Sequence, residues 1–269
     1  MAAERRDAPG RAAGGVRAAA TVFSCRGLGY SYLDRFPALR GIDLEVRRGE
    51  KVVLLGANGC GKSTLLKVLA GLVFCTAGTV EAFGEPLTER SLEDAGFSRA
   101  FRSRVQIVFQ NSDAQVFSPT VREEIAFGCL QMGLDPRATG ERTDDALALL
   151  GIEDLAGRTP FQLSDGQRKR VAIASVLAMN PQVLLLDEPT AALDPRTRHR
   201  VGDLVTRLHA AGRTVVLATH DLDAVDTRTD RAVVLGPDHT VLRDAPAAGV
   251  LSDPGLLHRA DLVHRPDPG

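Results

Sequence analysis

The sequence predicts an α/β fold built on a mostly parallel sheet that has helices on its faces. Three short apolar runs, at residues 52–55, 183–186 and 214–218, have the composition of strands buried on both faces of a parallel sheet. Helix-like patterns follow the first two runs, and this alternation is typical of parallel strands joined by crossover helices. From about residue 112 to residue 179 the pattern is mainly helical. We therefore expect an inserted helical subdomain.

The N-terminal part is expected to be antiparallel. Residues 42–46 alternate apolar and charged side chains, as a half-exposed antiparallel strand does, and the Gly49-Glu50 turn follows. The buried strand at 52–55 comes next. Helical patterning begins at Lys62 and has a plausible stop at Gly71.

Further along, Val105, Ile107 and Phe109 alternate with polar residues, and a helix-like stretch follows Pro195. We expect residues 21–250 to form one domain, with its helical subdomain at about 112–180. Residues 1–20, rich in Ala, Arg and Gly, are expected to be a disordered tail, and residues 251–269 a C-terminal tail.

Composition excludes several classes of function. Of the 269 residues, 44% are hydrophobic and 25% charged, which suits a globular protein with a sizeable core. The net charge of −1 provides no global field that would draw the chain to nucleic acid or anionic lipid. No apolar run is long enough to span a bilayer, so a role at a membrane would require a protein partner. The four cysteines match neither a zinc site nor a disulfide framework.

A phosphate-binding loop follows the strand at 52–55. The pattern G-x-x-x-x-G-K-S lets successive backbone N–H groups point at phosphate oxygens, and the next helix adds its positive N-terminal dipole. The lysine reaches the β- and γ-phosphates, and the serine hydroxyl can coordinate Mg²⁺. This motif, a Walker A loop, predicts a P-loop NTPase fold. It comprises Gly56, Ala57, Asn58, Gly59, Cys60, Gly61, Lys62 and Ser63, with Thr64 directly after it.

Two acidic residues, Asp187 and Glu188, end the strand run at 183–186. Ligands of parallel sheets bind at the C-terminal edge, where these carboxylates are expected. Asp187 would hold Mg²⁺ and Glu188 would act as general base toward a water molecule. An acidic pair after a strand is commonly only a solvated strand end, and the phosphate loop decides between the two interpretations.

A five-residue segment that precedes the strand run at 183–186 resembles the LSGGQ signature of the ABC ATPase family. Gln110 resembles the Q-loop of that family, Ala192-Leu193-Asp194 its D-loop, and His220 its H-loop, in matching order over residues 21–246. The signature residues here are Leu163, Ser164, Asp165, Gly166 and Gln167.

The resemblance implies that the nucleotide is ATP and that two subunits sandwich two ATP molecules head to tail. Ser164 and the helix after it would face the γ-phosphate held by the other subunit. His220 would orient the γ-phosphate and the attacking water, and Gln110 would contact Mg²⁺ or that water. Tyr32 is expected to stack on adenine, with Tyr30 as the competing candidate and core packing as the alternative for both.

One position departs from the family pattern, because Asp165 stands where glycine is usual. A carboxylate beside the partner's γ-phosphate would be unfavourable. We therefore hypothesise that Asp165 turns outward and that the site stays active.

A second set of segments resembles the cobalt-type branch, whose ATPases drive energy-coupling-factor importers of metal ions such as cobalt or nickel, or of vitamins. These segments are residues 108–121, 123–128, 168–174 and 177–181, with Ser112 standing where proline is common. The resemblance implies a peripheral protein at the cytoplasmic face of the cell membrane. Its partners would be a second ATPase subunit, identical or homologous, an integral membrane coupling subunit and a substrate-binding membrane subunit, with no nucleic acid.

Three alternatives remain open from the sequence. The chain could serve another ABC importer or exporter, act as a soluble ABC protein on DNA or ribosomes, or be an ATP-binding regulatory module. Glu188 and His220 argue against the last. The transported substrate cannot be read from these residues.

Overall fold

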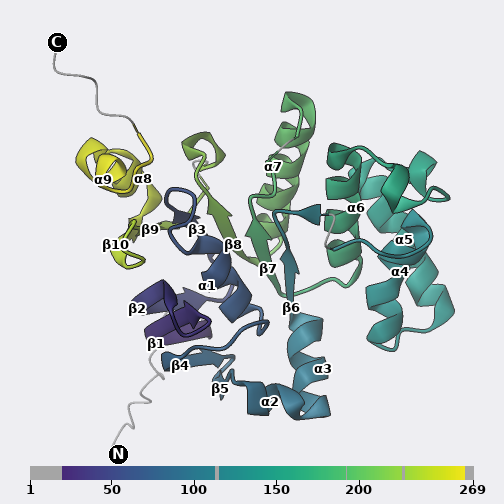
Figure 1. The fold of residues 1–269 in the computed structure, drawn as a ribbon. Coiled ribbons are helices and arrows are strands. Elements are labelled where there is room, and N and C mark those ends of the chain that lie inside the picture. Colours follow the sequence, from purple (N-terminus) through teal and green to yellow (C-terminus); the bar gives the residue numbers. More distant parts are fainter. Residues whose placement is uncertain (1–19, 113–114, 192, 226–227, 264–269) are drawn as a thin grey trace, which may run out of the picture.

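The computed structural model describes residues 20–112, 115–191, 193–225 and 228–263, so the predicted tail at 1–20 lies outside it except for Ala20. Two sheets form the framework (Figure 1). The smaller sheet is antiparallel, as predicted for the N-terminal part. It has the order β2-β1-β4-β5, with β1 (Thr21–Tyr32), β2 (Phe36–Arg47), β4 (Ala77–Ala82) and β5 (Glu85–Pro86).

The larger sheet is mostly parallel, which confirms the predicted fold class. Its order is β10-β9-β3-β8-β7-β6, and only the edge pair β9–β10 is antiparallel. The strands are β3 (Lys51–Leu55), β6 (Val105–Val108), β7 (Val183–Asp187), β8 (Thr214–Thr219), β9 (Arg231–Leu235) and β10 (Val241–Pro246).

The α-helices surround this sheet, and three of them make up the helical insert. That insert lies beside the β6 edge (Figure 1) and contains α4 (Val121–Gln131), α5 (Pro136–Leu150) and α6 (Asp165–Ala178). The others are α1 (Lys62–Leu69), α2 (Glu89–Glu93), α3 (Ala95–Arg104), α7 (Pro195–Ala210), α8 (Ala247–Leu251) and α9 (Pro254–Arg259).

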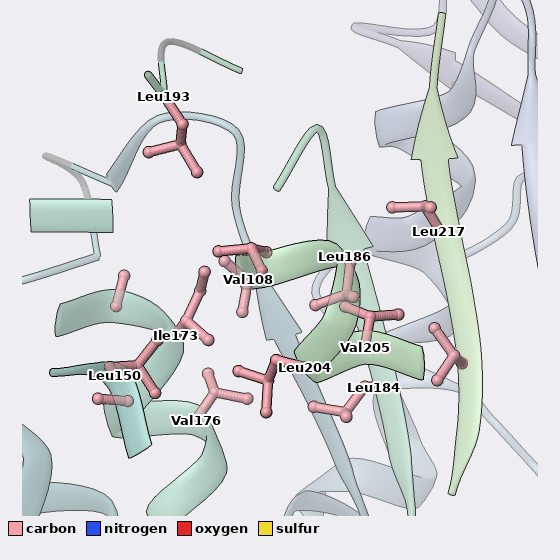
Figure 2. Packing of buried hydrophobic residues seen from close by; sticks show 14 of the residues in the cluster. Val108, Leu150, Ile173, Val176, Leu184, Leu186, Leu193, Leu204, Val205 and Leu217 are labelled. Carbon is pink, nitrogen blue, oxygen red and sulfur yellow. The ribbon is translucent and has the colours of Figure 1, made fainter. Parts of the chain in front are cut away.

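Strand β3 separates two hydrophobic clusters, because successive side chains of a strand point to opposite faces. Val52 and Leu54 join the cluster that contains α1 and the small sheet, whereas Val53 and Leu55 join the cluster that contains α6 and α7. Figure 2 shows the second cluster, where Leu184 and Leu186 of β7 lie near Leu204 of α7. All five residues of β3 are buried. The phosphate loop therefore starts from a strand that is held on both faces.

The C-terminal segment differs from the predicted tail. Helix α9 lies inside the stretch 251–269, and Leu256 and Leu257 are buried together with Ala260. Asp253 caps this helix by accepting a hydrogen bond from the Leu256 N–H group. A six-residue helix has too few turns to show a clear periodicity in sequence. It is ordered by packing against α8, which itself packs on β9.

Among the residues that the structure describes, no helix has both the length and the apolar character needed to cross a membrane.

Candidate functional site

The phosphate loop connects the end of β3 to the start of α1, and its glycines are required by close backbone contacts. Gly61 has a left-handed φ of 112°, and a Cβ atom at this position would lie 2.3 Å from the Ala38 carbonyl oxygen. A Cβ atom on Gly56 would lie 2.7 Å from the Leu235 carbonyl oxygen. The loop can therefore pass between β2 and β9 only with glycine at these two positions.

Lys62 begins α1 and is 5% exposed. Its Nζ atom donates to the carbonyl oxygens of Gly56 (2.6 Å) and Ala57 (3.0 Å), so the ammonium group lies across the phosphate loop. The N-terminus of α1 has no side-chain cap, and its first turn contains no acidic residue. The loop thus combines a fixed cation with an uncapped helix N-terminus, the two features that favour binding of an anion.

Ser63 and Asp187 meet although they come from elements far apart in sequence. The Ser63 hydroxyl donates to Asp187 Oδ1 at 3.0 Å. Burial raises the pKa of Asp187 above its ordinary value, and the hydrogen bond from Ser63 opposes that shift. A serine hydroxyl and a carboxylate at this spacing are hard oxygen donors, which Mg²⁺ prefers when phosphate oxygens complete its shell. These residues fit the predicted magnesium site.

Glu188 and His220 form a second contact at the ends of β7 and β8. Glu188 is 4% exposed and has a left-handed φ of 44°, a conformation that is costly for a non-glycine residue. One of its oxygens, Oε1, accepts from the backbone N–H of His220 (3.0 Å) and contacts His220 Nδ1 (2.7 Å). The other, Oε2, accepts from the Thr219 hydroxyl at 3.1 Å. The carboxylate is thereby fixed toward His220.

A cavity of about 430 Å³ joins many of the predicted residues. Tyr32 lines it and contacts the Thr64 hydroxyl at 3.1 Å, whereas Tyr30 is half-buried and meets Tyr32 edge-on. The geometry therefore favours Tyr32 over Tyr30 as the adenine contact. The cavity is lined by Tyr32, Phe36, Pro37, Ala38, Asn58, Gly59, Gly61, Lys62, Ser63, Thr64, Gln110, Glu188 and His239.

Sequence reasoning missed four of these lining residues, namely Phe36, Pro37 and Ala38 of β2 and the distant His239. His239 adopts a left-handed φ of 66° in the turn between β9 and β10, and its Nδ1 lies 3.3 Å from the Cys60 carbonyl oxygen. No local motif marks this histidine, because only the pairing of β9 with β3 brings the turn to the phosphate loop.

The signature residues do not join this cavity in the described part of the chain. Ser164 caps α6, and its hydroxyl accepts from the Gln167 N–H group while Gln167 Oε1 accepts from the Ser164 N–H group. Leu163 is buried and Gly166 lies in the first turn of α6. The side chain of Asp165 is 80% exposed, with Oδ1 3.1 Å from Arg168 Nη2. The carboxylate thus lies along the surface of its own helix, and the hypothesis that it turns away from the partner's γ-phosphate stays a prediction.

The other predicted residues lie at the ends of β6 and at the start of α7. Gln110 lines the cavity, and its backbone carbonyl accepts from Lys169 Nζ at 2.9 Å. Asp194 caps α7 by accepting from the Thr197 N–H group at 3.0 Å. Ala192 of the same predicted loop lies outside the described residues.

Comparison with known proteins gives a consistent picture. Residues 39–191 match the sequence profile of a family described as "ABC transporter". The chain is 47% identical to "Nickel import ATP-binding protein NikO" of Rhodobacter capsulatus, a match that covers 90% of this chain and 95% of that protein. It is 40% identical to "Energy-coupling factor transporter ATP-binding protein EcfA" of Methanosphaera stadtmanae, over 90% of this chain and 85% of that protein.

Solved structures agree. CbiO1 from Clostridium perfringens, described as part of the ABC transporter complex cbiONQ, has 34% identity and a TM-score of 0.74, covering 90% of this chain and 95% of that one. A dimeric ATP-binding cassette, MJ0796 bound to ADP and Pi, has 29% identity and a TM-score of 0.75, covering 84% of this chain and 98% of that one.

Proposed function

Because the chain belongs to the ABC transporter family, we propose that it is the ATP-hydrolysing subunit of an energy-coupling-factor importer that takes up nickel or cobalt ions. The observation that carries this proposal is that Lys62 and Glu188 line one cavity at the C-terminal ends of β3 and β7, where Glu188 contacts His220 and Asp187 accepts from Ser63. The similarity to the nickel import protein NikO and to CbiO1 supports the class of importer. A vitamin remains the alternative substrate for an importer of this type.

The phosphate loop would hold ATP through its backbone N–H groups, with Lys62 turning from its own loop carbonyls to the β- and γ-phosphates. Tyr32 would stack on adenine. Ser63, Asp187 and Gln110 would hold Mg²⁺, directly or through water. When bound there, the ion neutralises charge that develops on the phosphates.

Glu188 would accept a proton from the water that attacks the γ-phosphorus, as the bond to the ADP oxygen breaks. The Thr219 hydroxyl, the backbone N–H group of His220 and the His220 Nδ1 atom fix the orientation of this carboxylate. With Nδ1 bound to Glu188, the His220 Nε2 atom is the ring nitrogen that remains to contact the γ-phosphate. The two residues would therefore act as one unit.

A second ATPase subunit would complete the site. In the described chain the residues 163–167 lie apart from the cavity that contains Lys62, which supports a head-to-tail pair in which Ser164 and Gly166 face the other subunit's nucleotide. The ATP-bound dimer would then open after hydrolysis.

The membrane partners would dock on the helical insert, at the cytoplasmic face of the membrane. Phe117 and Phe127 are exposed and contact each other edge-on, with ring centroids 5.1 Å apart. Glu124 is buried beneath them and accepts from the N–H groups of Phe117 and Ser118. An ordered aromatic pair on the surface is suited to receive an apolar side of a coupling helix.

The test is Glu188→Gln, which preserves size and removes the base. We expect turnover of ATP to fall at least about 100-fold, ATP binding to persist, and an ATP-bound dimer to accumulate on gel filtration. Nickel uptake by cells that express the variant with its membrane partners should fall in parallel. Glu153→Gln, in a short exposed turn, is the matched control. Unchanged hydrolysis in Glu188→Gln would refute this role.

A further inference from the structure

Lys169 is a buried cation whose contacts none of the motifs explains. It lies in the second turn of α6 and is 3% exposed, whereas its neighbours Arg168 and Arg170 are only partly covered. Its Nζ atom donates to the carbonyl oxygens of Phe109 (2.7 Å) and Gln110 (2.9 Å). Both carbonyls lie just beyond the end of β6, where the sheet no longer provides them with donors. One ammonium group therefore joins α6 to the segment that carries Gln110.

The two segments that Lys169 joins, the Gln110 segment and helix α6, face different parts of the molecule. Gln110 lines the cavity that contains Lys62 and Glu188 of its own chain. The N-terminal end of α6 has Ser164 as its cap and Gly166 in its first turn, and neither lines that cavity. Lys169 follows Ser164 by five residues, or about 140° around the helix, so the lysine points inward from a different face. Figure 1 shows α6 between the helical pair α4–α5 and the sheet.

Burying an ammonium group here costs free energy that an apolar side chain would avoid. Burial lowers the pKa of Lys169 to about 8, and the nearby carboxylates of Asp187 and Glu188 oppose that shift. Helix α6 already packs through Val171, Ile173 and Val176, so the lysine is not needed to fill the core. What it adds to α6 is the pair of hydrogen bonds to the Gln110 segment.

We propose that Lys169 is a positioning residue that makes the Gln110 segment and the signature end of α6 move together, so that ATP binding in one site of the dimer shifts the residues that complete the other. This inference rests on the proposed function, because only in a head-to-tail pair do Gln110 and Ser164 serve different nucleotides.

The consequence is a coupling between the two ATP sites. A contact of Gln110 with Mg²⁺ or water in one site displaces the backbone of residues 109–110. Lys169 transmits that displacement to α6, and Ser164 moves relative to the γ-phosphate in the second site. Since coupling between two sites is reciprocal, loss of the link should weaken cooperativity in both directions.

The experiment compares wild type with Lys169→Met, Lys169→Arg and Arg170→Met, each as the full chain purified with its membrane partners. Arg170→Met is the matched control, because Arg170 is adjacent on α6 but donates to Leu150 and Gly151 within the helical insert. The readouts are the affinity of a fluorescent ATP analogue, and kcat, KM and the Hill coefficient for hydrolysis.

For Lys169→Met we expect analogue affinity within about twofold of wild type, kcat lower by about tenfold, and a Hill coefficient near 1. Lys169→Arg should recover at least half of kcat and the cooperativity, since its guanidinium group can donate to both carbonyls. Arg170→Met should stay near wild type. A Lys169→Met variant with wild-type kcat and Hill coefficient contradicts the inference, and so does an equal loss in Arg170→Met.

If Lys169→Met does not fold, Lys169→Gln replaces it. The inference then requires a lower Hill coefficient for Lys169→Gln than for Lys169→Arg, and equal values contradict it. A wild-type complex that binds ATP without any turnover contradicts the proposed function instead, which separates the two failures.

Discussion

Asp165 shows how one side chain can depart from a motif while its backbone keeps the motif's geometry. The helix α6 still begins at this residue, and Ser164 still caps it through the reciprocal bonds with Gln167. Arg168 lies one turn later, and its Nη2 atom also donates to the Leu163 carbonyl, so the guanidinium group is held in place. The carboxylate of Asp165 has a fixed cation beside it, and the positive N-terminal end of the helix dipole stabilises a negative charge in the first turn.

Asp165→Gly should therefore change kcat by no more than about threefold, because the carboxylate is exposed and paired with Arg168 along its own helix. Arg168→Met should lower kcat more strongly, since it frees the carboxylate to approach the partner's γ-phosphate. In the double variant, Asp165→Gly should cancel most of that loss. Steady-state ATP hydrolysis by the four proteins measures this cycle. A wild type that binds ATP but turns over only after Asp165→Gly would overturn the interpretation.

At the scale of elements, the sequence was most informative for strands and helices whose own apolar pattern marks them as buried. The runs 183–186 and 214–218 correspond to β7 and β8 within one residue, and the helix expected from Lys62 is α1. The ends of these strands then place Glu188 in contact with His220, next to Asp187, at the edge of the sheet where ligands of parallel sheets bind.

Other elements could not be read from local patterns, because distant partners decide their structure. β1 is 12 residues long but pairs with β2 through several register shifts, which interrupt the simple alternation of a strand. β9 becomes buried through its pairing with β3, and that pairing brings the His239 turn to Cys60. The contact of Lys169 with residues 109–110 likewise spans about sixty positions of sequence, and no spacing rule predicts it.

The start of α7 provides a test at this scale that involves pH. Hydrogen bonds from the Thr197 side chain and backbone lower the pKa of Asp194 below its ordinary value. A carboxyl group whose pKa is lowered in the folded state contributes stability above its unfolded pKa, and that contribution is lost as pH falls through the folded pKa. The cap should therefore weaken in acid.

We expect Asp194→Ala to lower the melting temperature at pH 7 by about 2 to 4 °C. Asp194→Asn keeps an accepting oxygen without a titrating group and is the matched control. The stability advantage of wild type over Asp194→Asn should shrink as pH falls from about 5 to 3. Thermal unfolding across this range measures it, and an advantage that grows toward acid would contradict the assignment.

At the scale of the molecule, two functional surfaces lie at different places along the larger sheet. One holds the phosphate loop between β2 and β9, and the other holds the helical insert with Phe117, Phe127 and the first turn of α6. The cavity around Lys62 is lined by Tyr32, Gln110, Glu188 and several residues of the phosphate loop, but by none of residues 163–167. If the proposed head-to-tail pair is right, a second chain completes the site, and we expect the purified protein to pair with itself in ATP.

Mixing two inactive variants tests that pairing. Lys62→Met removes the phosphate-binding cation, and Gly166→Asp places a charge in the signature while leaving Ser164 to cap α6. A Cβ atom on Gly166 meets only the Leu193 side chain, at 3.6 Å, so this substitution should not disturb the fold.

In a head-to-tail heterodimer, the intact phosphate loop of one chain meets the intact signature of the other, which restores one site of two. Half of the dimers in an equal mixture are heterodimers, so hydrolysis should recover to about one quarter of wild type if the two sites act independently, and to less if they are coupled as proposed above. Each variant alone should be inactive, and a mixture as inactive as its components would show that this chain does not complete its own site.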